Sequence, residues 1–128
     1  MVTRPAPAGF TLIELLVVMA ILAALLTIAA PRYFTHLERA RESALRQTLV
    51  VTRDAIDKFR GDTGKLPDSL DELVQRNYLR KLPMDPILES DSAWRLLPPP
   101  DPAQAGKLYD LRSSAPGSAL DGSRYGDW

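Results

Sequence analysis

The chain has 128 residues, and its 16 basic and 16 acidic side chains give a formal net charge of zero at neutral pH. It contains no cysteine, which excludes a disulfide framework, a thiol nucleophile and a cysteine-based zinc site. The length leaves room for one membrane helix and one small domain, and the balanced charge lacks the basic footprint of a nucleic-acid-binding protein. A domain this small needs another stabilising feature, such as a metal or assembly.

Residues 10–30 form an apolar run that is long enough to span a membrane. Glu14 is its only ionisable side chain, and the other residues are apolar or threonine. A helix rises about 1.5 Å per residue, so the run matches a hydrocarbon core about 30 Å thick. A carboxylate in such a run is costly and by default functional. The sequence therefore predicts a membrane helix with a functional acid near its N-terminal end.

The start of this run resembles a known processing motif. The string Gly-Phe-Thr-Leu-Ile-Glu at residues 9–14 is similar to the processing site of type IV prepilins and type II secretion pseudopilins. The resemblance implies that a dedicated peptidase removes residues 1–9 as a leader, cutting between Gly9 and Phe10, and that Phe10 is then N-methylated. It also implies that Glu14 and Pro31 occupy the family's acidic and helix-proline positions. In an ordinary secretory signal the cleavage site follows the apolar segment instead.

The charges around the apolar run bear on its orientation. Four arginines follow the run within residues 32–46, and only Arg4 and the amino terminus precede it. The positive-inside rule by itself therefore favours a cytoplasmic C-terminal domain. The resemblance implies the opposite orientation, because the family's leader lies in the cytoplasm where its peptidase works. We expect a single-pass protein of the bacterial inner membrane with a periplasmic C-terminal domain.

A helical pattern continues beyond Pro31. Apolar side chains recur at helical spacing from Phe34 to Phe59, while charges occupy the opposite face. The sequence predicts one helix over about residues 11–60, in which 10–31 form the transmembrane or filament-core part and 32–60 an amphipathic continuation. Pro31 lacks a backbone donor and should kink or locally loosen this helix.

Residues 61–128 predict a small globular domain. Ser69 to Glu72 fits a capping box that opens a short helix to about Tyr78, with Leu70, Leu73 and Val74 on its buried face. The segment from Tyr78 to Pro86 resembles a stretch of major pseudopilins that reads roughly Tyr-Leu-x-x-Leu-Pro-x-Asp-Pro.

Two short strands are expected in this domain, at residues 93–97 and 107–111. In the second strand Leu108 and Asp110 should share one face and Tyr109 and Leu111 the other. The prolines at 98–102 favour an extended connection over a tight hairpin turn. The predicted fold class is α+β and pilin-like: a long N-terminal helix, its first half transmembrane, packed on a small antiparallel sheet.

Candidate catalytic residues are few. His36, the only histidine, falls in an exposed helical register and is expected to contact solvent or lipid headgroups. Asp85 lies between two prolines and is expected to form a turn. With one histidine and no cysteine, the chain offers few residues for a catalytic nucleophile–base pair, and it contains no phosphate-binding loop or metallohydrolase motif. We therefore predict no enzymatic activity.

The tail from Ser113 to Trp128 is rich in glycine, serine and aspartate. Major pseudopilins bind calcium in a C-terminal loop of this character, so the resemblance implies a calcium site that uses Asp121 and Asp127 with main-chain carbonyls. The longer family loop is shortened here. The alternative is a turn-rich loop without metal, pinned by Tyr125 and Trp128.

These features predict a structural subunit of a type II secretion pseudopilus. The resemblance implies a homo-oligomeric helical filament in the periplasm, with prepilin peptidase/methyltransferase, an inner-membrane assembly platform, minor pseudopilins and membrane lipid as partners and no nucleic acid. It also implies that Glu14 meets the amine of a neighbouring Phe10. The alternative is a type IV pilin for adhesion, motility or DNA uptake. A signal-anchored periplasmic binding module is disfavoured, because an anchor needs no carboxylate at that depth.

Overall fold

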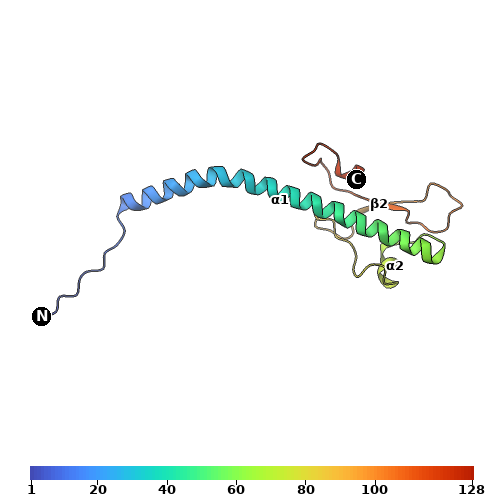
Figure 1. The fold of residues 1–128 in the computed structure, drawn as a ribbon, viewed down its shortest axis with the longest axis horizontal. Coiled ribbons are helices and arrows are strands. Elements are labelled where there is room, and N and C mark those ends of the chain that lie inside the picture. Colours follow the sequence, from blue (N-terminus) through green and yellow to red (C-terminus); the bar gives the residue numbers. More distant parts are fainter. The chain divides into compact units, whose positions relative to one another are not determined.

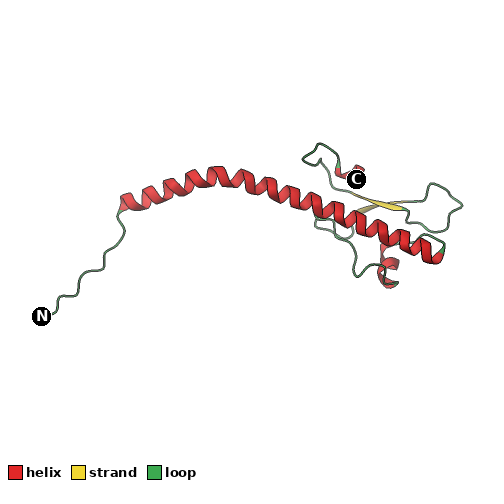
Figure 2. Cartoon of the chain, in the orientation of Figure 1, coloured by secondary structure: helices red, strands yellow, loops and turns green.

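The computed structural model describes residues 1–128 and contains two α-helices, two strands and one short 3₁₀ helix (Figure 1). These are α1 (Leu12–Thr63), α2 (Leu70–Gln75), β1 (Trp94–Leu97), β2 (Asp110–Ser113) and η1 (Tyr125–Asp127). The chain divides into two compact units, Met1–Leu37 and Glu38–Trp128. Much of the second unit is loop, drawn green in Figure 2. The predicted α+β fold class, with a long apolar helix and a two-strand antiparallel sheet, is confirmed.

The second half of α1 supplies one wall of the hydrophobic core. Leu45, Leu49, Ile56 and Phe59 recur at helical spacing and are at most 2% exposed. They pack in one cluster with the following buried side chains: Leu66, Leu70, Leu73, Leu79, Trp94, Leu108, Leu111, Ala115, Ala119 and Tyr125. The apolar stripe was expected to be buried from Phe34 onward, but Phe34 is 61% exposed and full burial begins at Leu45.

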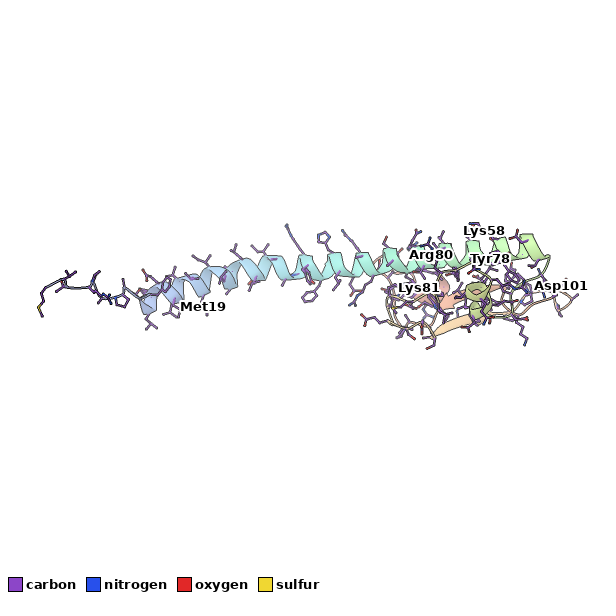
Figure 3. The ribbon with its side chains drawn as sticks, turned by 90° about the horizontal axis from the view of Figure 1, so that it is seen from below. Met19, Lys58, Tyr78, Arg80, Lys81 and Asp101 are labelled. Atoms are coloured by element: carbon purple, nitrogen blue, oxygen red, sulfur yellow. The ribbon has the colours of Figure 1, made fainter.

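Helix α2 begins as predicted and ends early. The Ser69 hydroxyl accepts a hydrogen bond from the Glu72 amide, and the Glu72 carboxylate accepts one from the Asp68 amide, one residue before the position of a standard capping box. The helix was expected to reach Tyr78, but Asn77 adopts a left-handed backbone (φ 63°), which stops it. Tyr78 turns toward α1, where its hydroxyl donates to Asp62 at 2.7 Å (Figure 3).

The two strands pair antiparallel, with Trp94 opposite Ser113 and Leu97 opposite Asp110. As predicted, a long connection through the proline run joins them. The expected bounds and alternation of the second strand are wrong. The strand starts at Asp110, and Leu108 lies before it as a buried core side chain whose amide donates to the Pro67 carbonyl at 2.9 Å. Leu108 and Leu111 therefore both face the core.

Asp85 forms the predicted turn and is also fully buried. One carboxylate oxygen accepts the amides of Ile87 and Leu88 at 2.8 and 3.2 Å, and the other accepts the Ser113 hydroxyl. The Ser113 oxygen in turn accepts the Ala115 amide at 3.1 Å. This chain of hydrogen bonds ties the loop after α2 to the end of β2, and it satisfies polar groups that water does not reach.

Replacing Asp85 with alanine should destabilise the second unit by roughly 3 kcal/mol, because it leaves several buried donors without an acceptor. The free energy of unfolding can be measured by urea denaturation in detergent micelles, followed by tryptophan fluorescence. Asp91→Ala is the matched control, since Asp91 is exposed and makes no hydrogen bond through its side chain. Equal losses in the two variants would show that the buried network does not stabilise the fold.

Candidate processing and assembly site

The Gly9–Phe10 bond lies in an exposed segment without regular structure. Residues 1–11 carry no helix or strand, and the Phe10 side chain is 93% exposed. A β-carbon built on Gly9 would meet no atom within 4 Å. Because nothing in the fold requires glycine at this position, any requirement for Gly9 has to come from a molecule that binds the segment.

Helix α1 opens with a capping box formed by Thr11 and Glu14. The Glu14 amide donates to the Thr11 hydroxyl at 3.2 Å, and the Thr11 amide donates to Oε2 of Glu14 at 2.8 Å. Two amides that the helix cannot satisfy itself thus find acceptors, and the carboxylate lies at the positive end of the helix dipole. Threonine followed three residues later by glutamate is the sequence signature of this cap, which the prediction of a functional acid at Glu14 did not include.

Glu14 is a lone carboxylate on an apolar surface. It lines a shallow hollow together with the apolar side chains of Phe10, Ile13, Val17 and Val18. Oε2 bonds to the Thr11 amide, while Oε1 makes no hydrogen bond or ion pair. The local cap lowers the cost of placing this carboxylate in lipid and leaves one oxygen available for a cation from another molecule.

The first half of α1 exposes its apolar side chains on every side. Every leucine, isoleucine, valine and methionine from Leu12 to Ile28 is more than half exposed. Figure 3 shows Met19 projecting from the helix with no other part of the chain beside it. By length and composition this stretch can cross a membrane. An exposed apolar surface that continues over so many residues marks contact with lipid or with other chains.

Pro31 lies inside α1, and the helix continues through it. Proline has no amide hydrogen, so the carbonyl of Thr27 loses its intrahelical donor. Two threonine hydroxyls bond to carbonyls near this position: Thr27 donates to the Ala23 carbonyl at 2.8 Å, and Thr35 to that of Pro31 at 3.1 Å. The expected local loosening of the helix stays a prediction.

The two tail carboxylates predicted to bind calcium have different surroundings. Asp121 accepts a hydrogen bond from Arg46 of α1 at 3.3 Å and two from Ser123. Asp127 lines a shallow pocket to which Arg95 and Arg124 also contribute and Asp121 does not. No group of three or more histidine, cysteine or acidic side chains is placed to hold a metal ion. Calcium takes six to eight oxygens, of which these two carboxylates would supply only part, and the predicted calcium site stays a prediction.

Comparison with known proteins gives matches at the N-terminus and along most of the chain. A family model described as a prokaryotic N-terminal methylation motif matches residues 4–30. Type II secretion system core protein G of Klebsiella pneumoniae is 31% identical over 137 aligned positions, which cover 94% of this chain and 93% of that protein. Its counterpart from Xanthomonas campestris pv. campestris is 32% identical over 72 positions, which cover 56% of this chain and 50% of the relative.

A relative from another system matches a shorter part of the chain. Competence protein ComGC of Halalkalibacterium halodurans is 31% identical over 72 positions, which cover 56% of this chain and 71% of that protein. No solved structure matches. The similarity that extends through nearly the whole chain is therefore to core protein G.

Replacing Thr11 with valine should loosen the first turn of α1, because valine keeps the shape of threonine and removes the capping oxygen. Loss of such a cap costs about 1 kcal/mol, so the Glu14 amide should exchange its hydrogen about fivefold faster in detergent micelles. Thr27→Val is the control, since the Thr27 hydroxyl bonds within the helix and caps nothing. Unchanged exchange at Glu14 would contradict the capping role.

Proposed function

The chain belongs to the type II secretion system core protein G family, and from this membership we propose that it is a major pseudopilin, the structural subunit of a type II secretion pseudopilus. The observation that carries the proposal is the uncovered apolar half of α1, which lies within the match to the methylation motif at residues 4–30. Such a surface suits a subunit that is stored in lipid and then buries the same helix against other copies of itself.

Maturation is the first step of the proposed function. A prepilin peptidase cuts between Gly9 and Phe10, removes residues 1–9 and N-methylates Phe10. The exposed, irregular segment around this bond supports the assignment, because a protease needs an extended and accessible chain. Glycine at position 9 suits a narrow subsite on the enzyme, since the fold itself makes no demand for it.

Replacing Gly9 with leucine should leave the leader attached and the fold unchanged. N-terminal mass spectrometry of protein isolated from the membrane should find N-methylated Phe10 first in the wild type and residue 1 first in the variant. Ala8→Leu is the control for added bulk next to the site. A wild-type terminus other than Phe10 would contradict the proposed processing.

Assembly is the second step, and Glu14 is its proposed polar contact. Removal of the leader creates an amine at Phe10, next to the capped first turn. Oε1 of Glu14 makes no bond within the chain and can accept a hydrogen bond from the Phe10 amine of a neighbouring subunit. In a bundle of apolar helices an unpaired charge is costly, whereas a hydrogen-bonded pair of opposite charges offsets its own desolvation. The pair forms only when Glu14 of one subunit lies level with Phe10 of the next, so it holds the subunits in one axial register.

Variants of Glu14 and Thr11 separate the proposed assembly contact from the helix cap. Glu14→Ala should insert into the membrane normally and give at least tenfold fewer filaments by immunoblot of sheared fractions and electron microscopy. Glu14→Gln, which keeps size and hydrogen bonding but removes the charge, should also assemble poorly. Thr11→Val removes only the hydroxyl cap and should assemble close to the wild-type level. Normal filaments from Glu14→Ala would refute the role.

The proposed location and partners follow from the proposed processing and assembly. The subunit crosses the inner membrane once, with the leader in the cytoplasm and residues 32–128 in the periplasm. Its partners are other copies of itself, the processing enzyme, the inner-membrane assembly platform and minor pseudopilins. The role is structural rather than enzymatic, in keeping with a chain that has one histidine and no cysteine.

A type IV or competence pilin is the second candidate, and the match with ComGC is the observation that favours it. The pseudopilin function ranks first because the core protein G of Klebsiella pneumoniae aligns with 94% of the chain and ComGC with 56%. Deleting the gene distinguishes the two: loss of secreted enzymes from the medium supports the pseudopilus, and loss of DNA uptake or surface motility with normal secretion supports the pilus.

A further inference from the structure

The C-terminal tail, residues 114–128, has little apolar surface with which to hold itself on the domain. Ala115, Ala119 and Tyr125 are its only side chains that are fully buried. Most of its other residues are polar or glycine, and the chain has no cysteine to close the loop covalently. The tail therefore needs contacts other than hydrophobic burial to hold it on the domain, and its polar contacts with α1 supply them.

Arg46 of α1 completes a closed ring of contacts with the tail. Its guanidinium carbon lies 3.9 Å from the centroid of the Trp128 ring, and its Nη2 donates to Oδ2 of Asp121 at 3.3 Å. Oδ1 of Asp121 accepts the Ser123 hydroxyl at 2.6 Å, and the Ser123 oxygen accepts the Trp128 indole N–H at 2.8 Å. One cation thus meets both an aromatic face and a carboxylate of the same loop.

Arg53 binds the tail two helical turns further along α1, which is about 10 Å along the axis and on the same face. Its Nη2 donates to the main-chain oxygens of Trp128 and Leu111 at 2.6 and 3.1 Å, and its Nε donates to the Asp110 carboxylate at 2.8 Å. The planar guanidinium group of Arg53 thus joins the end of the tail to the start of β2. Arg53 therefore gathers main-chain and carboxylate oxygens around one positive charge.

Glu42 supplies a third attachment from the same helix. Its Oε1 accepts the Leu120 amide at 2.7 Å and the Tyr125 hydroxyl at 3.4 Å. Burial of Tyr125, with Glu42 nearby, raises the pKa of the phenol, so the hydroxyl stays protonated and able to donate at neutral pH. The tail is thus attached to α1 at residues 42, 46 and 53.

The oxygens that would be needed for a metal are already used or lie beside positive charge. The Ser123 hydroxyl and amide, with Arg46, lower the pKa of the Asp121 carboxyl, which keeps it ionised for the ion pair. Arg95 and Arg124 line the same pocket as Asp127, and Arg95 donates to the Gly126 carbonyl at 2.8 Å. Positively charged side chains in this pocket disfavour a divalent cation there.

We propose that Arg46 and Arg53 hold the tail in place of a bound calcium ion, so that the fold of residues 38–128 is independent of calcium. The positive charge that a metal would bring is supplied by two arginine side chains of α1, which bind the Asp121 carboxylate and the main-chain oxygen of Trp128. On the proposed pseudopilin function, filament formation is then independent of calcium as well.

The test is thermal unfolding of the full chain in detergent micelles, followed by tryptophan fluorescence and circular dichroism. The wild-type midpoint should be the same in 2 mM calcium and in excess EGTA. Arg46→Ala and Arg53→Ala should each lower the midpoint by about 5 °C in both conditions, because they remove the attachment. Arg39→Ala is the matched control, since Arg39 is exposed on the same helix and makes no ion pair.

Two further variants keep the proposal falsifiable if Arg53→Ala does not fold. Ser123→Ala breaks the ring at a half-buried position and should also lower the midpoint, whereas Asp127→Ala should leave it unchanged. A midpoint that rises in calcium, or arginine variants that unfold like Arg39→Ala, would overturn the proposal. These midpoints are measured without assembly, so their outcome is separate from processing and secretion, on which the proposed function depends.

Discussion

The structure depends on one constraint: a single helix has to satisfy two different surroundings. Twelve large aliphatic or methionine side chains from Leu12 to Ile28 are more than half exposed. Burying them is worth roughly 20–35 kcal/mol at 1.5–3 kcal/mol each. A carboxylate in the same run costs about 3 kcal/mol. Covering these side chains with lipid or with other chains therefore outweighs the cost of the Glu14 carboxylate.

The capping box explains how one residue can serve both surroundings. Within a single chain Glu14 satisfies the Thr11 amide and lies at the positive end of the helix dipole, so the carboxylate is never wholly without a partner. Its other oxygen makes no bond within the chain. One side chain can therefore cap its own helix and still bind a neighbouring subunit in the proposed filament.

The second unit, Glu38–Trp128, solves a different problem, because it is small and lacks disulfides. Its compact centre is apolar, but its loops are fixed by charged side chains that each bind several main-chain groups. Asp85 holds the loop after α2 against β2, and Arg53 holds the tail against α1. Each contact joins segments that are distant in the sequence, which is how a covalent cross-link would act, but through hydrogen bonds to charged groups.

The sequence by itself determined the apolar run, the processing motif, the long helix through Pro31 and the core positions from Leu45 to Phe59. These are local or periodic signals, and helical spacing converts them directly into a buried face. It also contains the signature of the Thr11–Glu14 cap, since a threonine three residues before a glutamate at the start of an apolar run is typical of a capping box.

Only the tertiary structure decided the start of β2, the burial of Asp85 and the attachment of the tail. Leu108 packs in the core from a loop in which its amide bonds to Pro67, and Asp121 is bound by Arg46, 75 residues away. Composition alone could not distinguish a calcium loop from an arginine-bound one, since both need acidic and main-chain oxygens. The partner of each oxygen depends on which face of α1 the tail meets, and that is settled by long-range packing rather than by local sequence.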